Sequence, residues 1–225
     1  MDCPMYKNET FDKSGMILIQ EVLRSFPLDS SPGSEYIYSN FGYVVLGRAI
    51  EKITGMTYQN FVTSNILTRC GINGMRIGFS PPGSDEVQYN NLTNEWNPNL
   101  FFDIRRMDSS GGWVANPIEL LKILARVDLG NNVPDILRRD TILTMTRPSR
   151  QNPNYSLGWS VWDNNWSHSG FIQGVRTTMT RNSQGFNWVI LMNSCYTPEM
   201  SDGDFHELFW EIHRAVPRWS RGIKL

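Results

Sequence analysis

The sequence predicts an α+β protein in which a mostly helical lobe precedes an antiparallel sheet that is covered by a C-terminal helix. Three observations support this fold class. Up to about residue 146, except in residues 69–110, the apolar residues recur at helical spacing. After Pro148 they alternate along short segments, and from about Asp204 to Val216 the helical spacing returns. The change of period predicts two domains, a helical lobe over 1–146 and a sheet with its helix over 147–225.

The helical lobe begins with a predicted helix over Ser14–Arg24, which Pro27 ends because proline does not fit a helix interior. The longest helix signal covers Phe41–Thr54, and Gly55 behind it is typical of a helix C-terminus. Thr57 is expected to cap a third helix that runs to about Leu67.

The helix over Phe41–Thr54 is strongly amphipathic. Its charged residues Arg48, Glu51 and Lys52 are expected to face water, and the side chain of Asn40 is expected to cap its first turn. The predicted inward stripe consists of Phe41, Val45, Leu46, Ala49, Ile50 and Ile53.

Residues 69–110 have no regular period and are rich in Gly, Pro and Asn, which predicts a long loop of the kind that usually lines a site. Asn116-Pro117-Ile118-Glu119 then predicts a helix start with a cap, a proline at the first position and an acid at the third. A broken helical segment follows from Pro134 to Thr146. The helix after Asn116 is expected to end at Gly130 and to bury Ile118, Leu121, Leu124 and Ala125.

The sheet region contains three clear strand signals. Alternation predicts strands over Tyr155–Val161 and Val175–Arg181, and a nearly continuous apolar run predicts one over Phe186–Met192. Asn182-Ser183-Gln184-Gly185 is short enough to join the last two as an antiparallel hairpin. The final helix is expected to bury Phe205, Leu208, Phe209, Ile212 and Val216.

The bulk composition excludes several classes of partner. The 225 residues carry a net charge of −1 with scattered basic residues, so there is no electrostatic footprint for nucleic acid or an anionic membrane. No apolar run approaches the roughly 20 residues that span a bilayer, which predicts a soluble protein. No signal peptide is visible, and the compartment stays undetermined.

The sequence offers no set of metal ligands. Cys3, Cys70 and Cys195 are too widely spaced for a zinc site and odd in number for a disulfide framework. His206 and His213 lie seven residues apart on one predicted helix, about 10 Å at 1.5 Å per residue, which is too far for one metal ion. We therefore expect neither a metal nor a cofactor.

Two short motifs contain side chains that could take part in binding or catalysis. Tyr38-Ser39-Asn40 places a phenol and a carboxamide two residues apart ahead of the longest helix, where both can face one cleft. His168-Ser169-Gly170, followed by Gly174, lies in the strand region. Taken singly, each also has a structural explanation: a half-buried aromatic, a helix cap, and a strand histidine with a satisfied hydrogen bond.

Together the motifs resemble those of the serine beta-lactamase-like family, which includes class C beta-lactamases, D-alanyl-D-alanine carboxypeptidases and related esterases. That family has three site motifs: Ser-x-x-Lys, Tyr-x-Asn or Ser-Asp-Asn, and Lys-Thr-Gly or His-x-Gly. The surrounding stretches that match in the same order are Pro32-Gly33-Ser34, Phe41-Gly42-Tyr43, Ile53-Thr54-Gly55, Ser110-Gly111-Gly112-Trp113 and Tyr155-Ser156-Leu157-Gly158-Trp159. The resemblance runs from about Pro27 to the C-terminus and implies an incomplete beta-lactamase/transpeptidase-like fold.

The resemblance also implies residue roles in acyl transfer on an amide or ester. Tyr38 would transfer protons, Asn40 would donate its amide to the substrate, and His168, where many members have lysine, would assist Tyr38 or bind a carboxylate. The strand Ser169, Gly170 and Phe171 would present backbone groups to the substrate. Gly111 and Gly112 would shape the rim of the site.

The chain departs from the family in one motif, because no Ser-x-x-Lys occurs anywhere in it. In the family that motif precedes Tyr-x-Asn by many tens of residues, whereas only 37 residues precede Tyr38 here. We therefore expect an N-terminally truncated relative that is inactive as this chain alone. The alternative is a non-catalytic remnant that binds a ligand or a protein.

Other residues do not readily replace the missing serine. Ser109 and Ser110 lie in the predicted loop, but nothing around them is expected to supply a base. Cys195 with His168 on a neighbouring strand is better explained as a buried, inert thiol. The expected ligand is a small-molecule or peptide-like amide or ester, and the incomplete sheet predicts self-association or a partner chain.

Overall fold

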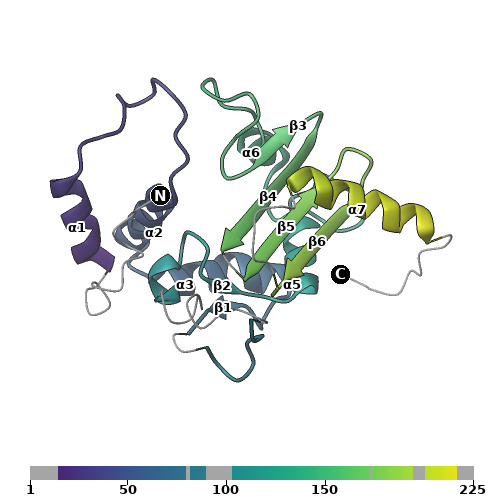
Figure 1. Ribbon diagram of the computed structural model, residues 1–225, viewed down its shortest axis with the longest axis horizontal. Coiled ribbons are helices and arrows are strands. Elements are labelled where there is room, and N and C mark those ends of the chain that lie inside the picture. Colours follow the sequence, from purple (N-terminus) through teal and green to yellow (C-terminus); the bar gives the residue numbers. More distant parts are fainter. Residues whose placement is uncertain (1–14, 80–81, 90–102, 173, 195–200, 217–225) are drawn as a thin grey trace. The chain divides into compact units, whose positions relative to one another are not determined.

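The computed structural model describes residues 15–79, 82–89, 103–172, 174–194 and 201–216 (Figure 1). By the contacts between Cα atoms, the chain divides into two units: Met1–Gln88 with Thr93–Ala115, and Tyr89–Leu92 with Asn116–Leu225. The sequence assigns residues 116–146 to the helical lobe, whereas this division groups them with the sheet. The boundary at residue 146 stays a prediction.

The first unit is built from helices and one short sheet. Its elements are α1 Gly15–Ser25, α2 Asn40–Thr54, α3 Tyr58–Val62, the π-helical turn η3 Thr63–Leu67, the 3₁₀ turns η4 Thr68–Cys70 and η5 Ile104–Met107, and the antiparallel strands β1 Arg76–Ile77 and β2 Trp113–Val114. The three predicted helices are therefore present. The predicted loop over 69–110 contains one of the two short strands and the turn η5.

The caps of α2 and α3 explain where these helices begin and end. Gly55 ends α2 in the left-handed conformation, with φ of 70°, and its N–H donates to the Glu51 carbonyl. Thr57 caps α3, as predicted, by accepting from the Asn60 N–H at 3.2 Å. The cap of α2 is Ser39, whose hydroxyl accepts from the Gly42 N–H at 3.0 Å. The prediction that Asn40 caps this helix is wrong, because Asn40 is already its first residue.

The predicted inward stripe of α2 is also partly wrong. Leu46 is 57% exposed and Ile53 is 84% exposed, whereas Val44 and Gly47 are buried. The helix is rotated from the expected orientation because Val44 packs against Ile19 of α1, while Gly47 lies against Ser109. Arg48, expected in water, forms an ion pair with Asp108 on that face.

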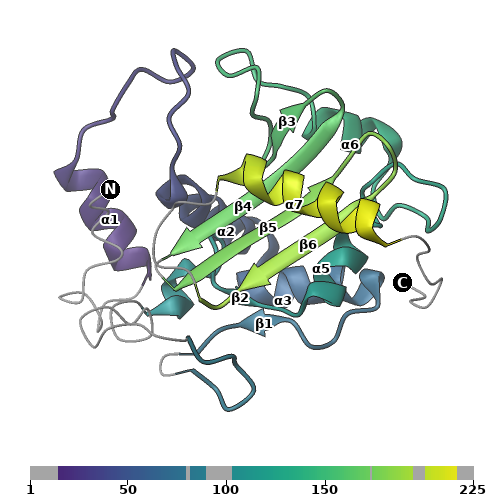
Figure 2. The ribbon, with the colours of Figure 1, turned by 45° about the vertical axis from the view of Figure 1, so that its right-hand side comes forward.

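The second unit contains an antiparallel sheet with helices on both faces. Its elements are α5 Pro117–Leu124, α6 Arg139–Met145, β3 Ser160–Trp162, β4 Asn165–Ile172, β5 Val175–Arg181, β6 Asn187–Met192 and α7 Asp202–Ala215. The strand order is β3-β4-β5-β6, with every neighbour antiparallel. Figures 1 and 2 show α7 over one face of β4 to β6 and α5 against the other. This arrangement confirms the predicted α+β class.

The predicted start of α5 is confirmed in detail. Asn116 accepts from the Glu119 N–H and the Glu119 carboxylate accepts from the Asn116 N–H, both at 3.0 Å, with Pro117 at the first helical position. Leu124 and Ala125 are buried, as predicted. Ile118 is 45% exposed, because only one side of this helix meets β5 and β6. The helix ends at Leu124, well before Gly130.

The strand predicted over Tyr155–Val161 is regular only from Ser160. The Ser156 N–H donates to the Trp159 carbonyl and Gly158 has φ of 85°, so a tight turn interrupts the first half. The hairpin at Asn182-Ser183-Gln184-Gly185 joins β5 and β6, as predicted.

Aromatic rings attach α7 to the sheet. The rings of Trp188 and Phe209 stack with centroids 4.0 Å apart, and the His206 ring lies 5.4 Å from the Trp188 ring. Phe205 is fully buried, whereas Ile212 is 46% exposed, contrary to prediction. The rings of α7 that contact Phe186 and Trp188 belong to His206, Phe209, Trp210 and His213. The contact face is centred on these residues, and Ile212 lies to one side of it.

Candidate active site

The first group of predicted site residues lies at the start of α2. Tyr38 precedes the helix, and its hydroxyl donates to Oδ1 of Asn40 at 3.0 Å. This bond engages the carbonyl end of the carboxamide, and the described residues offer no partner to its Nδ2 group. Asn40 therefore keeps two N–H donors available for a ligand.

Tyr38 is held as a neutral phenol. Burial raises the pKa of Tyr38 above its ordinary value, and the neighbouring phenol of Tyr43 raises that pKa further. The side chain nevertheless remains accessible, with the residue 42% exposed. At neutral pH Tyr38 is a hydrogen-bond donor and an accessible acid, and it is not a phenolate.

Helix α2 is clamped by the segment that carries the glycine pair. The Ser109 hydroxyl donates to the Tyr43 carbonyl at 2.9 Å, and Arg48 pairs with the Asp108 carboxylate. A Cβ atom on Gly47 would lie 2.2 Å from the Ser109 hydroxyl oxygen, so only glycine permits this close approach. Residues 108–109 are thereby fixed against the helix that begins at Asn40.

Gly111 and Gly112 follow that clamp directly. The Met107 carbonyl accepts from both of their N–H groups at 2.9 Å, and the Gly112 carbonyl accepts from the Gly78 N–H at 2.9 Å. A Cβ atom on Gly112 would lie 2.6 Å from the Ile104 carbonyl oxygen. Gly111 adopts φ of 153°, which L side chains rarely adopt, so both positions favour glycine. Their role at a rim stays a prediction.

His168 lies on β4 in the second unit. Its Nδ1 atom is 2.7 Å from the Gly158 carbonyl oxygen, which can only accept. Nδ1 therefore carries the proton, and Nε2 of the neutral ring is left as an acceptor. His168 can therefore have both a structural role and a site role: the Gly158 carbonyl anchors Nδ1, and Nε2 has no partner in the part of the chain that the structure describes.

The strand around Ser169, Gly170 and Phe171 has an open edge. β3 pairs with β4 only between Asn165 and Ser167, so beyond Ser167 this edge has no strand neighbour among the described residues. On the other side a Cβ atom on Gly170 would lie 2.8 Å from the Thr177 hydroxyl oxygen, while Ser169 donates to Thr178 at 3.2 Å. Unpaired backbone groups at such an edge can bind an extended ligand.

The predicted site residues thus form two groups. Tyr38, Asn40 and the glycine pair belong to the first unit, whereas His168 and the strand Ser169–Phe171 belong to the second. The structure joins Tyr38 to Asn40 by a hydrogen bond and places His168 on the same strand as Ser169. Within the described residues, no three His, Cys, Asp or Glu side chains could hold a metal ion.

The alternative nucleophiles have structural roles. The Ser109 hydroxyl donates to the Tyr43 carbonyl, and the Ser110 hydroxyl donates to the Met107 carbonyl at 3.3 Å. A carbonyl oxygen is no base of useful strength. The Ser109 hydroxyl also lies 3.1 Å from Oδ1 of Asp108, but Arg48 engages that carboxylate in the clamp on α2. Cys195 lies outside the described residues.

Sequence reasoning missed the residues that support this site. Arg48 and Asp108 form the clamp, and the Gly158 carbonyl sets the histidine tautomer. One signal was available in the sequence, since a glycine inside a helix, here Gly47, indicates close packing against another segment. A backbone carbonyl partner such as Gly158 leaves no sequence signal.

Comparisons with known proteins agree with these motifs. The profile of the Beta-lactamase family matches residues 6–209. An Escherichia coli K12 protein with the provisional name D-alanyl-D-alanine carboxypeptidase is 24% identical over 165 residues, which make up 63% of this chain and 38% of that protein. Its Salmonella typhi counterpart is 27% identical over the same shares. The chain therefore spans well under half the length of these curated relatives.

Solved structures share the fold. The D-amino acid amidase from Ochrobactrum anthropi SV3, complexed with D-phenylalanine, matches with a TM-score of 0.68 and 18% identity, over 94% of this chain and 68% of that one. The penicillin-binding protein from Bacillus halodurans matches with a TM-score of 0.63 and 17% identity, over 86% and 62%. Because the family profile covers most of the sequence, this chain belongs to the beta-lactamase family and is a relative of its serine hydrolases.

Proposed function

We propose that this chain carries two of the three motifs of an acyl-transfer site for amides or esters. The observation that supports this most directly is the hydrogen bond of 3.0 Å from the Tyr38 hydroxyl to Oδ1 of Asn40. It orders a proton-transfer group and an amide donor as one unit, which acyl transfer requires. A phenylalanine at position 38 would lack the hydroxyl and could not serve this role.

The roles follow from the chemistry of each group. Tyr38, as a neutral phenol, donates a proton to the leaving group, and the Nδ2 group of Asn40 binds a substrate carbonyl. Nε2 of His168 accepts a proton or, when the ring is protonated, binds a substrate carboxylate. The open strand edge at Ser169 to Phe171 binds the substrate backbone, and Gly111 and Gly112 border the site.

The nucleophile is the missing part of this site. The sequence contains no Ser-x-x-Lys. The Ser109 hydroxyl lies 3.1 Å from the Asp108 carboxylate, but Arg48 engages that carboxylate in an ion pair, and Ser110 donates only to the Met107 carbonyl. We propose that these 225 residues alone form no acyl-enzyme. The test is to incubate the protein with a penicillin and, separately, with a fluorophosphonate, and to measure its intact mass. An unchanged mass is expected, and a covalent adduct would overturn the proposal.

The alternative is a chain that binds an amino acid or peptide-like ligand without turnover. It is favoured by the Nδ2 group of Asn40, which has no partner among the described residues, and by the amino acid ligand of the O. anthropi relative. Titration calorimetry with D-phenylalanine amide tests it. Asn40→Ala should weaken binding about tenfold, equivalent to about 1.4 kcal/mol, whereas Asn60→Ala on α3 should not. If both variants bind D-phenylalanine amide with equal affinity, Asn40 is not part of the binding site.

A further inference from the structure

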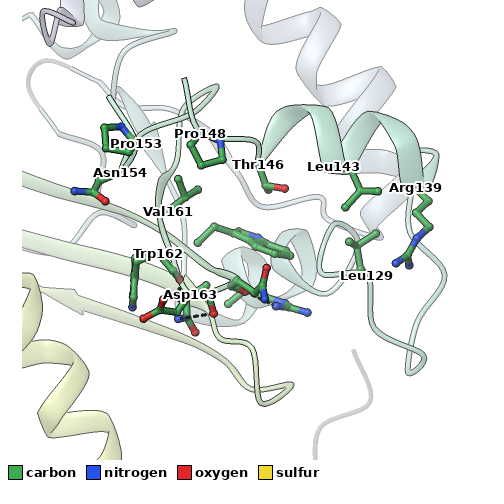
Figure 3. Close-up of a pocket in the computed structure, with 14 residues that line it drawn as sticks. Leu129, Arg139, Leu143, Thr146, Pro148, Pro153, Asn154, Val161, Trp162 and Asp163 are labelled. Atoms are coloured by element: carbon green, nitrogen blue, oxygen red, sulfur yellow. Dashed lines mark hydrogen bonds between the residues drawn. The ribbon is translucent and has the colours of Figure 1, made fainter. Parts of the chain in front are cut away.

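The second unit contains a cavity that none of the predicted site residues lines (Figure 3). Its volume is about 720 Å³, and it lies where the β3–β4 turn, the end of β5 and helix α6 come together. Pockets for small ligands typically span about 300–1,000 Å³. The cavity is therefore large enough for a small organic molecule.

A guanidinium without a carboxylate partner forms part of the cavity wall. Arg181 ends β5, and its side chain donates to the Asp128 carbonyl at 3.0 Å and to the Asn164 carbonyl at 2.8 Å. No carboxylate oxygen of the described residues lies within 4.0 Å of it. Burial lowers the pKa of Arg181, and the negative charge of Asp128 opposes this effect only in part. The charge is partly desolvated and incompletely compensated.

An aromatic ring and a second arginine add to this wall. The Arg181 guanidinium lies over the Trp166 ring, 4.1 Å from its centre, and this cation–π contact together with the two carbonyl bonds holds the arginine at the cavity wall. Arg139, the first residue of α6, also lines the cavity and has an exposed side chain. In Figure 3 Arg139 lies beside Leu129 and Leu143. The cationic groups thus border an apolar surface.

The apolar surface is formed by aliphatic side chains. Leu129, Leu143 and Val161 all line the cavity. Leu129 adopts a left-handed backbone conformation, with φ of 58°, which is unfavourable for a bulky L-residue. Such conformations persist where the surrounding structure imposes them, and they cluster at ligand sites.

We propose that this cavity binds a small aromatic carboxylate. The flat apolar part of the ligand packs on Leu129, Leu143 and Val161, and its carboxylate binds the arginine pair. The charged residues that line the cavity are one acidic residue, Asp163, and the two arginines. The net charge of the lining is therefore positive and favours an anionic ligand. The ligand compensates the Arg181 charge that the described residues leave without a carboxylate.

The cavity is separate from the strand edge predicted to bind substrate. Trp166 lies three residues before Ser169 on β4, which corresponds to about 10 Å along an extended strand. Both positions belong to the second unit. Binding at the cavity therefore does not depend on the proposed function. If no ligand binds there, the proposed function is unaffected.

The test uses 1-naphthoate and its uncharged analogue 1-naphthamide as probes, with titration calorimetry of the 225-residue protein. We expect saturable binding of the carboxylate, at least about tenfold weaker binding of the amide, and weakening by salt. Arg139→Gln and Arg181→Lys should each reduce naphthoate affinity by about tenfold. Arg150→Gln, an exposed arginine outside the cavity, is the matched control and should bind normally.

Two results would overturn this proposal. Equal affinity for naphthoate and naphthamide would show that charge plays no part. Unchanged naphthoate affinity in both the Arg139 and Arg181 variants would place the ligand elsewhere. Because Arg139 is exposed at the start of a helix, its variant keeps the test decisive even if Arg181→Lys unfolds the protein. D-phenylalanine amide at saturation should not displace naphthoate.

Discussion

The hydrogen bond between Tyr38 and Asn40 determines which donors of the two side chains remain for a ligand. The phenol proton is directed to the carboxamide oxygen, which leaves the amide N–H groups for a ligand. The sequence predicted both residues through their spacing before a helix. It did not predict that Ser39 would be the cap, because serine and asparagine are equally good caps and stand side by side.

The ionisation of Tyr38 can be predicted from its surroundings. Burial and the neighbouring Tyr43 disfavour the phenolate, so the pKa of Tyr38 lies above the ordinary value of 10.0. Near-ultraviolet absorbance across an alkaline titration measures this when Tyr38→Phe is subtracted from the wild type. The difference curve should show one phenol that ionises above pH 10.0. A Tyr38 signal that titrates below that value would contradict this and would allow Tyr38 to act as a base.

At the scale of the element, α2 illustrates what a hydrophobic pattern determines. The pattern correctly predicted the helix and its end at Gly55, since both follow from local backbone chemistry. The pattern did not predict which face is covered. That choice depends on the distant segment with Asp108 and Ser109, which brings a carboxylate to Arg48 and a hydroxyl against Gly47.

The clamp on α2 predicts that replacing Gly47 by alanine destabilises the protein, although alanine is the better helix former. Alanine favours a helix over glycine by about 1 kcal/mol, yet a Cβ atom on Gly47 would lie 2.2 Å from the Ser109 hydroxyl oxygen. Gly47→Ala should therefore lower the free energy of unfolding by about 1–3 kcal/mol in urea denaturation. Gly42→Ala on the same helix is the control, because its nearest atoms lie at 3.6 Å. Similar stability of both variants would contradict the clamp.

At the scale of the whole molecule, the class and the order of elements were predictable because both follow from local periodicity. The strand predicted over Tyr155–Val161 begins too early, because the alternation of apolar residues does not reveal the turn at Gly158. The division into two units could not be located, because it depends on contacts between distant residues. The cavity beside Arg181 left no sequence signal either, as its lining comes from separate elements of the second unit.

Exposed apolar side chains on α2 predict association between molecules. Leu46 and Ile53, which are 57% and 84% exposed, lie seven residues apart and therefore on one helix face. Sedimentation velocity across a range of protein concentrations should show self-association, and the double variant Leu46→Ser with Ile53→Ser should reduce it. Leu157→Ser, at a leucine that is 69% exposed in the second unit, should leave it unchanged. A wild-type protein that stays monomeric at every concentration would show that this face needs no partner.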